Sequence, residues 1–190
     1  VGQVNNTGAL AVVVQGGTET FGLNRRSDGD VWGYGIVTGG DILNAGNVTV
    51  TAAGGTSSGQ GEVDADVNAW GIYSNAGGTV MNSGDVVVTV VGATADNGDA
   101  ETGMTVYAVA IAAAAISNAG DVTVAATGGH MTGGDSEAFA DVSAFGLRSD
   151  TVENGGAITV TAAGPTAGAL PVIYESVFAC GISAGSVRNG

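Results

Sequence analysis

The 190-residue chain is short of several residue types, and each shortage excludes a class of protein. Its single cysteine, Cys180, rules out an internal disulfide and is interpreted as a small core residue. Four arginines, no lysine and 18 acidic residues give a net charge of −14, which excludes electrostatic binding of nucleic acid or anionic lipid. No apolar run reaches the roughly 18 residues of a membrane-spanning helix, so direct membrane insertion is not expected.

Side chains for catalysis are scarce as well. The lone histidine, His130, has no second histidine or cysteine beside it to complete a metal site, and the absence of lysine excludes Schiff-base chemistry. Asp64 and Asp66 are spaced as carboxylate pairs sometimes are in solenoid lyases and glycosidases, but no basic residue is near them. We therefore expect no enzyme and no cofactor, with calcium as the one possible exception discussed below.

What the chain has in abundance is glycine, 35 residues, together with valine and alanine in a regular repeat. The motif Asn-x-Gly-x-apolar-x-Val begins at Asn6, Asn44, Asn82, Asn118 and Asn154, and Asn189 marks a sixth copy. The successive spacings are 38, 38, 36, 36 and 35 residues, so the chain is a tandem array. We interpret residues 1–190 as a single domain and as a segment of a longer repetitive chain.

Each repeat predicts three short strands. Val86, Val88 and Val90 alternate with more exposed positions in the asparagine block, as they would in a strand with one buried face. A second block, DVNAWGI at 66–72, recurs in every repeat. Short strands at a constant period predict an all-β fold, a parallel β-helix (β-solenoid) of about five coils of 35–38 residues. A variable loop is expected to leave one corner of each coil, over residues 16–30, 54–65, 92–103, 128–140 and 164–175.

The repeated positions suggest structural roles. The asparagines fall at a corner, where we expect their stacked side chains to form an internal ladder: Asn6, Asn44, Asn82, Asn118, Asn154 and Asn189. The glycine two residues after each asparagine is expected to supply a positive φ. In the second block we expect the large side chains, such as Trp70, to point inward and the alanines and glycines to form a smooth outer stripe. Threonines such as Thr49 and Thr51 are interpreted as exposed strand residues rather than as an ice-binding array.

Carboxylates concentrate in three adjacent variable stretches. They are Glu62, Asp64, Asp66, Asp96, Asp99, Glu101, Asp135, Glu137 and Asp141. Calcium prefers carboxylate and carbonyl oxygens, so these nine residues are candidate calcium ligands. None of the stretches matches an EF-hand loop or the GGxGxD repeat, and the alternative is a solvated acidic edge.

The pattern G-I-x(6–9)-V-x-N-x-G-x-I/V-x-V-x-A, clearest in GIYSNAGGTVMNSGDVVVTV at 71–90, resembles the passenger domains of bacterial autotransporters and related filamentous-haemagglutinin-type surface proteins. The resemblance implies a right-handed β-helix that is secreted, displayed on a Gram-negative cell surface and engaged in adhesion to a host or cell-surface receptor. It carries no catalytic residues over.

Two other functions remain open. Val4-Asn5-Asn6 has the same repeat phase as Val187-Arg188-Asn189, and neither end has an evident polar cap. A self-assembling extracellular fibre subunit, stacked head to tail through its terminal coils, would explain this. The third hypothesis is a carbohydrate-binding or carbohydrate-active solenoid, because aromatic rows on solenoids sometimes bind sugars.

Overall fold

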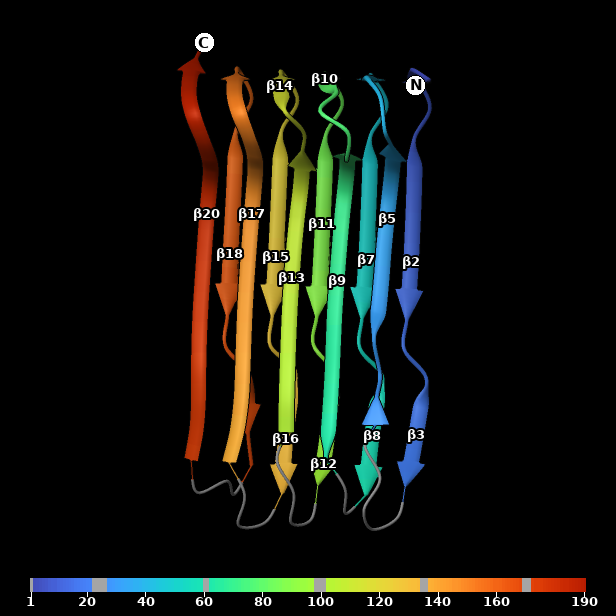
Figure 1. Cartoon of the computed structure of the whole chain (residues 1–190), viewed down its shortest axis with the longest axis vertical. Coiled ribbons are helices and arrows are strands. Elements are labelled where there is room, and N and C mark those ends of the chain that lie inside the picture. Colours follow the sequence, from blue (N-terminus) through green and yellow to red (C-terminus); the bar gives the residue numbers. More distant parts are fainter. Residues whose placement is uncertain (1, 22–26, 60–61, 98–101, 134–136, 169–171) are drawn as a thin grey trace.

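The computed structural model describes residues 2–21, 27–59, 62–97, 102–133, 137–168 and 172–190. Within these ranges every regular element is a β-strand. Each strand pairs in parallel with its counterpart one repeat away. The strands stack into a β-solenoid of about five coils, with the N-terminal strands at one end and the C-terminal strands at the other (Figure 1). The predicted fold class is therefore confirmed.

Three parallel sheets form the walls of the solenoid. Sheet A contains β1 (Val4–Asn6), β4 (Ser27–Asp28), β5 (Val31–Thr38), β6 (Ile42–Asn44), β9 (Val63–Ser74), β10 (Thr79–Asn82), β13 (Thr102–Ala112), β14 (Ala115–Asn118), β17 (Glu137–Asn154) and β20 (Val172–Asn189). Sheet B contains β2 (Leu10–Gln15), β7 (Val48–Ala53), β11 (Val86–Val91), β15 (Val122–Thr127) and β18 (Ile158–Ala163). Sheet C contains β3 (Thr18–Phe21), β8 (Thr56–Gly59), β12 (Thr94–Asn97), β16 (His130–Gly133) and β19 (Thr166–Ala167). Coils 1 to 5 are named here after their sheet A strands β5, β9, β13, β17 and β20.

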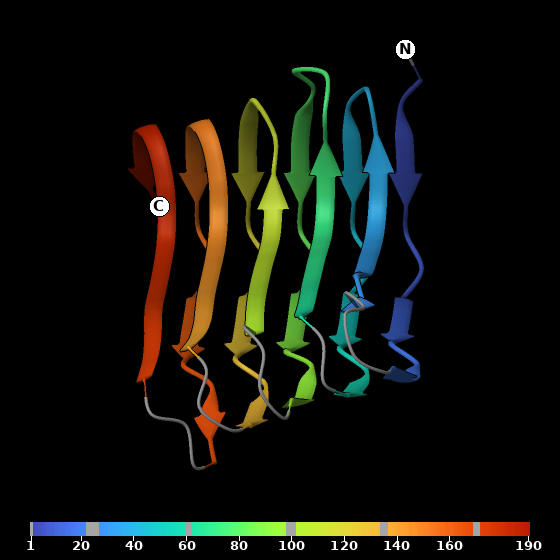
Figure 2. The ribbon, with the colours of Figure 1, turned by 60° about the horizontal axis from the view of Figure 1, so that its bottom comes forward.

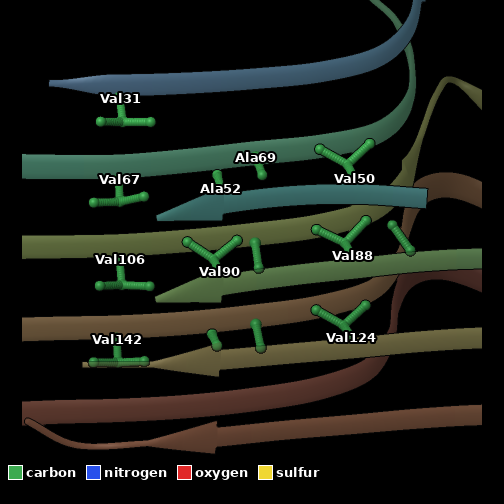
Figure 3. Close-up of a cluster of buried hydrophobic side chains, with 14 of the residues drawn as sticks. Val31, Val50, Ala52, Val67, Ala69, Val88, Val90, Val106, Val124 and Val142 are labelled. Atoms are coloured by element: carbon green, nitrogen blue, oxygen red, sulfur yellow. The ribbon is translucent and has the colours of Figure 1, made fainter. Parts of the chain in front are cut away.

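Alternation of valine with smaller or polar residues builds the core. In β11, Val86, Val88 and Val90 are fully buried, while Val87 and Thr89 between them face outward. Equivalent residues stack in register from coil to coil, as the columns Val31–Val67–Val106–Val142 and Val50–Val88–Val124 show (Figure 3). No coil could bury this face alone, so the stacking of coils forms the core.

Most described residues of the variable stretches form strands, so the prediction of loops is wrong for those residues. They carry the strands of sheet C, which lie side by side along one edge of the solenoid (Figure 2). Inward residues continue the core there: Ala95 and Met131 occupy one column and are about 1% exposed. The period-two alternation was hidden because the inward positions are not uniformly apolar, as Ser57 is buried in the same column as Ala95.

The glycines after the asparagines have a different role from the one predicted. Among the described residues only Gly77 has a positive φ, of 81°. At Gly84 a Cβ would instead run into the carbonyl oxygen of Gly46 in the preceding coil, and at Gly120 into that of Gly84. The corner needs glycine because the backbones of successive coils approach closely there, not because of a left-handed conformation.

The most consequential correction concerns the second block. The aromatic side chains face outward, and the alanines and glycines between them face the core: Trp32 is 50% exposed, whereas Ala69 is fully buried. The alternation breaks at Gly71, which is skipped in the pairing of β9 with β13, so that Gly71 and Ile72 both point inward. Counting back from the buried isoleucine with strict period two therefore places every aromatic residue on the wrong face.

Candidate functional site

A chain of aromatic rings crosses the outer face of sheet A from coil 1 to coil 5. The register of β5, β9, β13, β17 and β20 places the rings alternately in two neighbouring rows, so one ring of each coil meets a ring of the next. The rings in order are Trp32, Trp70, Tyr107, Phe145 and Phe178, with successive centroids 5.7, 5.6, 5.7 and 5.3 Å apart. Such separations suit favourable aromatic pairing, so the rings brace one another across the coils.

The first two coils hold the densest part of this cluster. Tyr34 and Trp70 occupy the same register position and stack at 4.9 Å with planes 8° apart. Trp32 lies parallel to both rings, and Tyr73 lies 6.4 Å from Trp70 at a 30° tilt. Burial raises the pKa of Tyr34, and repulsion from Tyr73 raises it further.

A hollow of about 730 Å³ opens beside these rings because coil 3 has small residues where coil 2 has large ones. The register pairs Trp70 with Val109 and Tyr73 with Ala112. Val109, Ala112 and Ala113 line the floor of the hollow, and the first two are buried. Tyr73 consequently has no ring in the next coil to stack on, and it stands as one wall of the hollow.

The opposite wall is polar. The Arg148 guanidinium lies 5.5 Å from the centre of the Phe145 ring and donates a hydrogen bond to the Tyr107 hydroxyl. This fixes the arginine in place, with a cation–π contact that also orients the ring. Ser149 and Asp150 follow on the same strand and line the hollow, as does Asn75, which comes directly after β9. In the described part of the chain, the Asn75 and Asp150 side chains make no hydrogen bond with protein groups, so they can serve a ligand.

The asparagine row forms the ladder at a corner between sheets A and B. Each Nδ2 from Asn6 to Asn118 donates to the Oδ1 of the next asparagine, at 2.7, 2.6, 2.7 and 2.8 Å. The same Nδ2 donates to the glycine carbonyl two residues on, as in the 2.7 Å bond from Asn82 to Gly84. Asn189 pairs in register with Asn154 through β20 and lies exposed at the end of the row. The row is structural, because its central members are buried and their donors are used within the row.

A second polar row, which the sequence analysis did not single out, lies beside the ladder. The backbone N–H of Asp85 donates to Asn47 Oδ1, that of Asp121 to Asp85 Oδ1 and that of Ala157 to Asp121 Oδ1, at 2.9–3.1 Å. Carboxylates in this row therefore cap backbone donors of the next coil, which gives part of the negative charge a structural use.

The nine candidate calcium ligands are spread over the molecule. Asp99, Glu101 and Asp135 lie outside the described residues. Asp96 is on sheet C, where it accepts a hydrogen bond from Thr132 at 3.0 Å. On sheet A, Thr105 lies between Asp66 and Asp141 in the register. Glu62 and Asp64 come just before Asp66 in the chain. Glu137 is the first residue of β17. Among the residues that the structure describes, no three acidic, histidine or cysteine side chains are grouped so as to hold a metal, and calcium binding stays a prediction.

The carboxylate of Asp66 has a shifted pKa. Burial raises the pKa of Asp66, a hydrogen bond from Thr105 counteracts this, and the neighbouring Asp30 and Asp64 raise the pKa again. The backbone N–H of Asp66 itself donates to Asp30 Oδ1 at 3.2 Å, which holds the two carboxylates close.

Cys180 and His130 are the single cysteine and the single histidine of the chain. Cys180 is half-buried in the outer row that contains Phe145, not in the core, and donates to the Ile182 carbonyl at 3.2 Å. The exposed His130 ring hydrogen-bonds Thr166 at 2.9 Å across two strands of sheet C.

Sequence reasoning missed the aromatic hollow because it assumed unbroken alternation. A usable signal was present: a glycine directly precedes the buried aliphatic residue in four of the five coils, as in Gly71-Ile72 and Gly146-Leu147. A glycine inside a strand pattern marks a bulge or a close approach, and either one resets the alternation.

The described ranges contain no helix of the length and hydrophobicity needed to cross a membrane. Searches of protein-family models, curated proteins and solved structures returned no match to this chain.

Proposed function

We propose that this chain is an extracellular, adhesive β-solenoid of a bacterial cell surface, with the outer face of sheet A as its contact surface. The observation that carries the proposal is the exposed aromatic cluster around the hollow, in which Trp32 is 50% and Tyr34 38% exposed. Aromatic residues supply much of the binding energy at recognition surfaces, and here they sit on a rigid stack of strands rather than on loops. The resemblance of the repeat pattern to that of autotransporter passenger domains supports the extracellular setting.

The solenoid suits this role mechanically. Each coil is held to the next by strand pairing on three sheets, by the asparagine row and by the aromatic chain. A contact made at one point on sheet A is therefore anchored by the whole stack. No part of the proposal requires a reaction, so the chain acts by binding and not by catalysis.

Retention of coated beads under flow tests this function. Beads carrying the chain should remain on epithelial monolayers or mucin-coated glass at shear rates that remove albumin-coated beads. A Trp32→Ala/Trp70→Ala double variant should lose most of this retention, while Tyr174→Ala, an aromatic change on the same sheet outside the hollow, should keep it. Retention no better than that of albumin on every surface would overturn the proposal.

A further inference from the structure

We propose that the hollow on sheet A binds a neutral carbohydrate chain, with Trp70 and Tyr73 as its aromatic wall and Arg148, Asn75 and Asp150 as its polar contacts. This inference rests on the proposed adhesive function and names the class of ligand that the contact surface recognises.

The two walls of the hollow match the two kinds of group on a sugar. A pyranose ring presents C–H groups on its faces, and their slight positive charge complements the negative face of an aromatic ring. Its hydroxyls need both donors and acceptors. The Arg148 guanidinium donates, the Asp150 carboxylate accepts and the Asn75 amide does both. A purely apolar partner would leave these groups buried without hydrogen bonds, which disfavours it.

The arrangement of the rings argues against a cationic ligand. Recognition of a quaternary ammonium group requires rings that surround the cation. Here Trp32, Tyr34 and Trp70 are stacked with planes within 12° of one another, so these rings do not surround a point at which a cation could sit. The cation–π position at Phe145 is already filled by Arg148.

Charge argues against an acidic glycan. The chain carries −14, and the one arginine of the hollow is accompanied by Asp150. An anionic polymer lying along sheet A would be repelled by Asp64, Asp66 and Asp141 on the same sheet, whereas a neutral sugar meets no such penalty. A volume of about 730 Å³ is within the usual range of sites for small ligands and leaves room for more than one sugar ring.

Intrinsic tryptophan fluorescence can detect binding at this site, because the chain has two tryptophans and both line the hollow. Tryptophan emission is followed during titration with cellotetraose, maltotetraose, mannotetraose, xylotetraose and N-acetylchitotetraose, and affinity is confirmed by calorimetry. At least one of these neutral sugars should give a saturable change. A tetragalacturonate, matched in length but acidic, should bind more weakly than the best neutral sugar.

Three variants that keep both tryptophans locate the binding. Tyr73→Ala removes one stacking surface and should weaken binding about tenfold. Ala112→Tyr fills the floor with the residue that coil 2 has at the same register, so the fold should accept it while binding is lost. Tyr174→Ala, which breaks the stack on Phe139 outside the hollow, should leave affinity unchanged.

Several outcomes would overturn the inference. One is the absence of any saturable change with all five neutral sugars at millimolar concentrations. Another is binding that survives both Tyr73→Ala and Ala112→Tyr. A third is concentration-dependent dimerisation in sedimentation that Tyr73→Ala abolishes, which would assign the hollow to a second copy. Coated beads that adhere without sugar binding would overturn this inference alone, whereas sugar binding without bead retention would overturn only the adhesive function.

Discussion

At the scale of single residues, the asparagine row stabilises the stack because each central member satisfies several buried polar groups at once. Asn82 donates to Gly84 and Asn118 and accepts from Asn44, and it is 3% exposed. Replacing Asn82 with alanine leaves a buried donor on Asn44 and buried acceptors on Gly84 and Asn118 without partners. A loss of this kind costs about 1–3 kcal/mol per unsatisfied group.

We therefore expect Asn82→Ala to lower the urea midpoint of unfolding substantially, by an amount equivalent to about 3 kcal/mol. Asn189→Ala is the matched control, because Asn189 holds the same place in the repeat but is exposed. Its effect should stay within about 0.5 kcal/mol. Equal effects of the two substitutions would show that the row contributes no cooperative stability.

At the scale of single strands, the break in alternation at the glycine of each long strand of sheet A decides which side chains face outward. A Cβ at Gly71 would come within 2.6 Å of both the Ala110 carbonyl oxygen and Val86 Cγ1. At Gly181, the same position in coil 5, the nearest atom would be Ile158 Cγ2 at 3.8 Å. The chemistry of the two positions is identical, and only the available space differs.

Gly71→Val should therefore destabilise the solenoid by several kcal/mol through overpacking, while Gly181→Val should be tolerated. The measurement is thermal unfolding followed by far-UV circular dichroism. Comparable melting temperatures for the two variants would mean that the strand does not turn its glycine toward sheet B.

The stability of the folded chain should also depend on pH, because adjacent strands of sheet A partly bury Asp66 and place other carboxylates near it. Because the pKa of Asp66 is higher in the folded protein than in the unfolded chain, the folded state holds the proton more tightly. Stability then falls as pH rises through the interval between the two pKa values, and the full penalty is present above the folded pKa. Below the ordinary aspartate pKa of about 3.9, the penalty is absent.

Asp66→Asn keeps an oxygen acceptor for Thr105 but removes the charge that faces Asp30 and Asp64. It should raise the urea midpoint at pH 7, and this gain should shrink as pH is lowered toward about 4. Asp141→Asn, two coils away in the same register, controls for the loss of one negative charge from the row. A gain at pH 7 that is unchanged at pH 4 would contradict the account.

The strands also show how far sequence reasoning reaches in this fold. The period of the repeat, the parallel stacking and the inward face of strands such as β11 follow from the spacing of Asn82, Val86 and Val88, because one alternating segment has only one buried face. Sheet C was missed because its inward column includes a polar residue, Ser57, which obscures the alternation. The outward aromatic face was missed because the recurring glycine marks where the alternation breaks but not that it turns inward. Its inward direction depends on contact with sheet B, which lies elsewhere in the repeat.

At the scale of the whole molecule, protection should vary along the stack. The inward side chains of coils 2 to 4 are almost entirely buried, whereas β2 and β20 each pair with a strand on one side only. Hydrogen exchange followed by mass spectrometry should therefore show slow exchange in β9, β11 and β13 and faster exchange in β2 and β20. Uniform exchange along the chain would indicate all-or-none unfolding of the entire solenoid.

The central claim is that the aromatic residues of sheet A face outward instead of filling the core, and that those of coils 1 to 3 line an open hollow. Acrylamide quenching of tryptophan emission tests it most directly, because acrylamide is uncharged and the chain has two tryptophans, Trp32 and Trp70, both on that face. We predict ready quenching of the native protein, with the Trp70→Phe variant, which retains the half-exposed Trp32, quenched more strongly than Trp32→Phe. Blue-shifted emission that resists acrylamide until the protein is unfolded would place the tryptophans in the core and contradict the account.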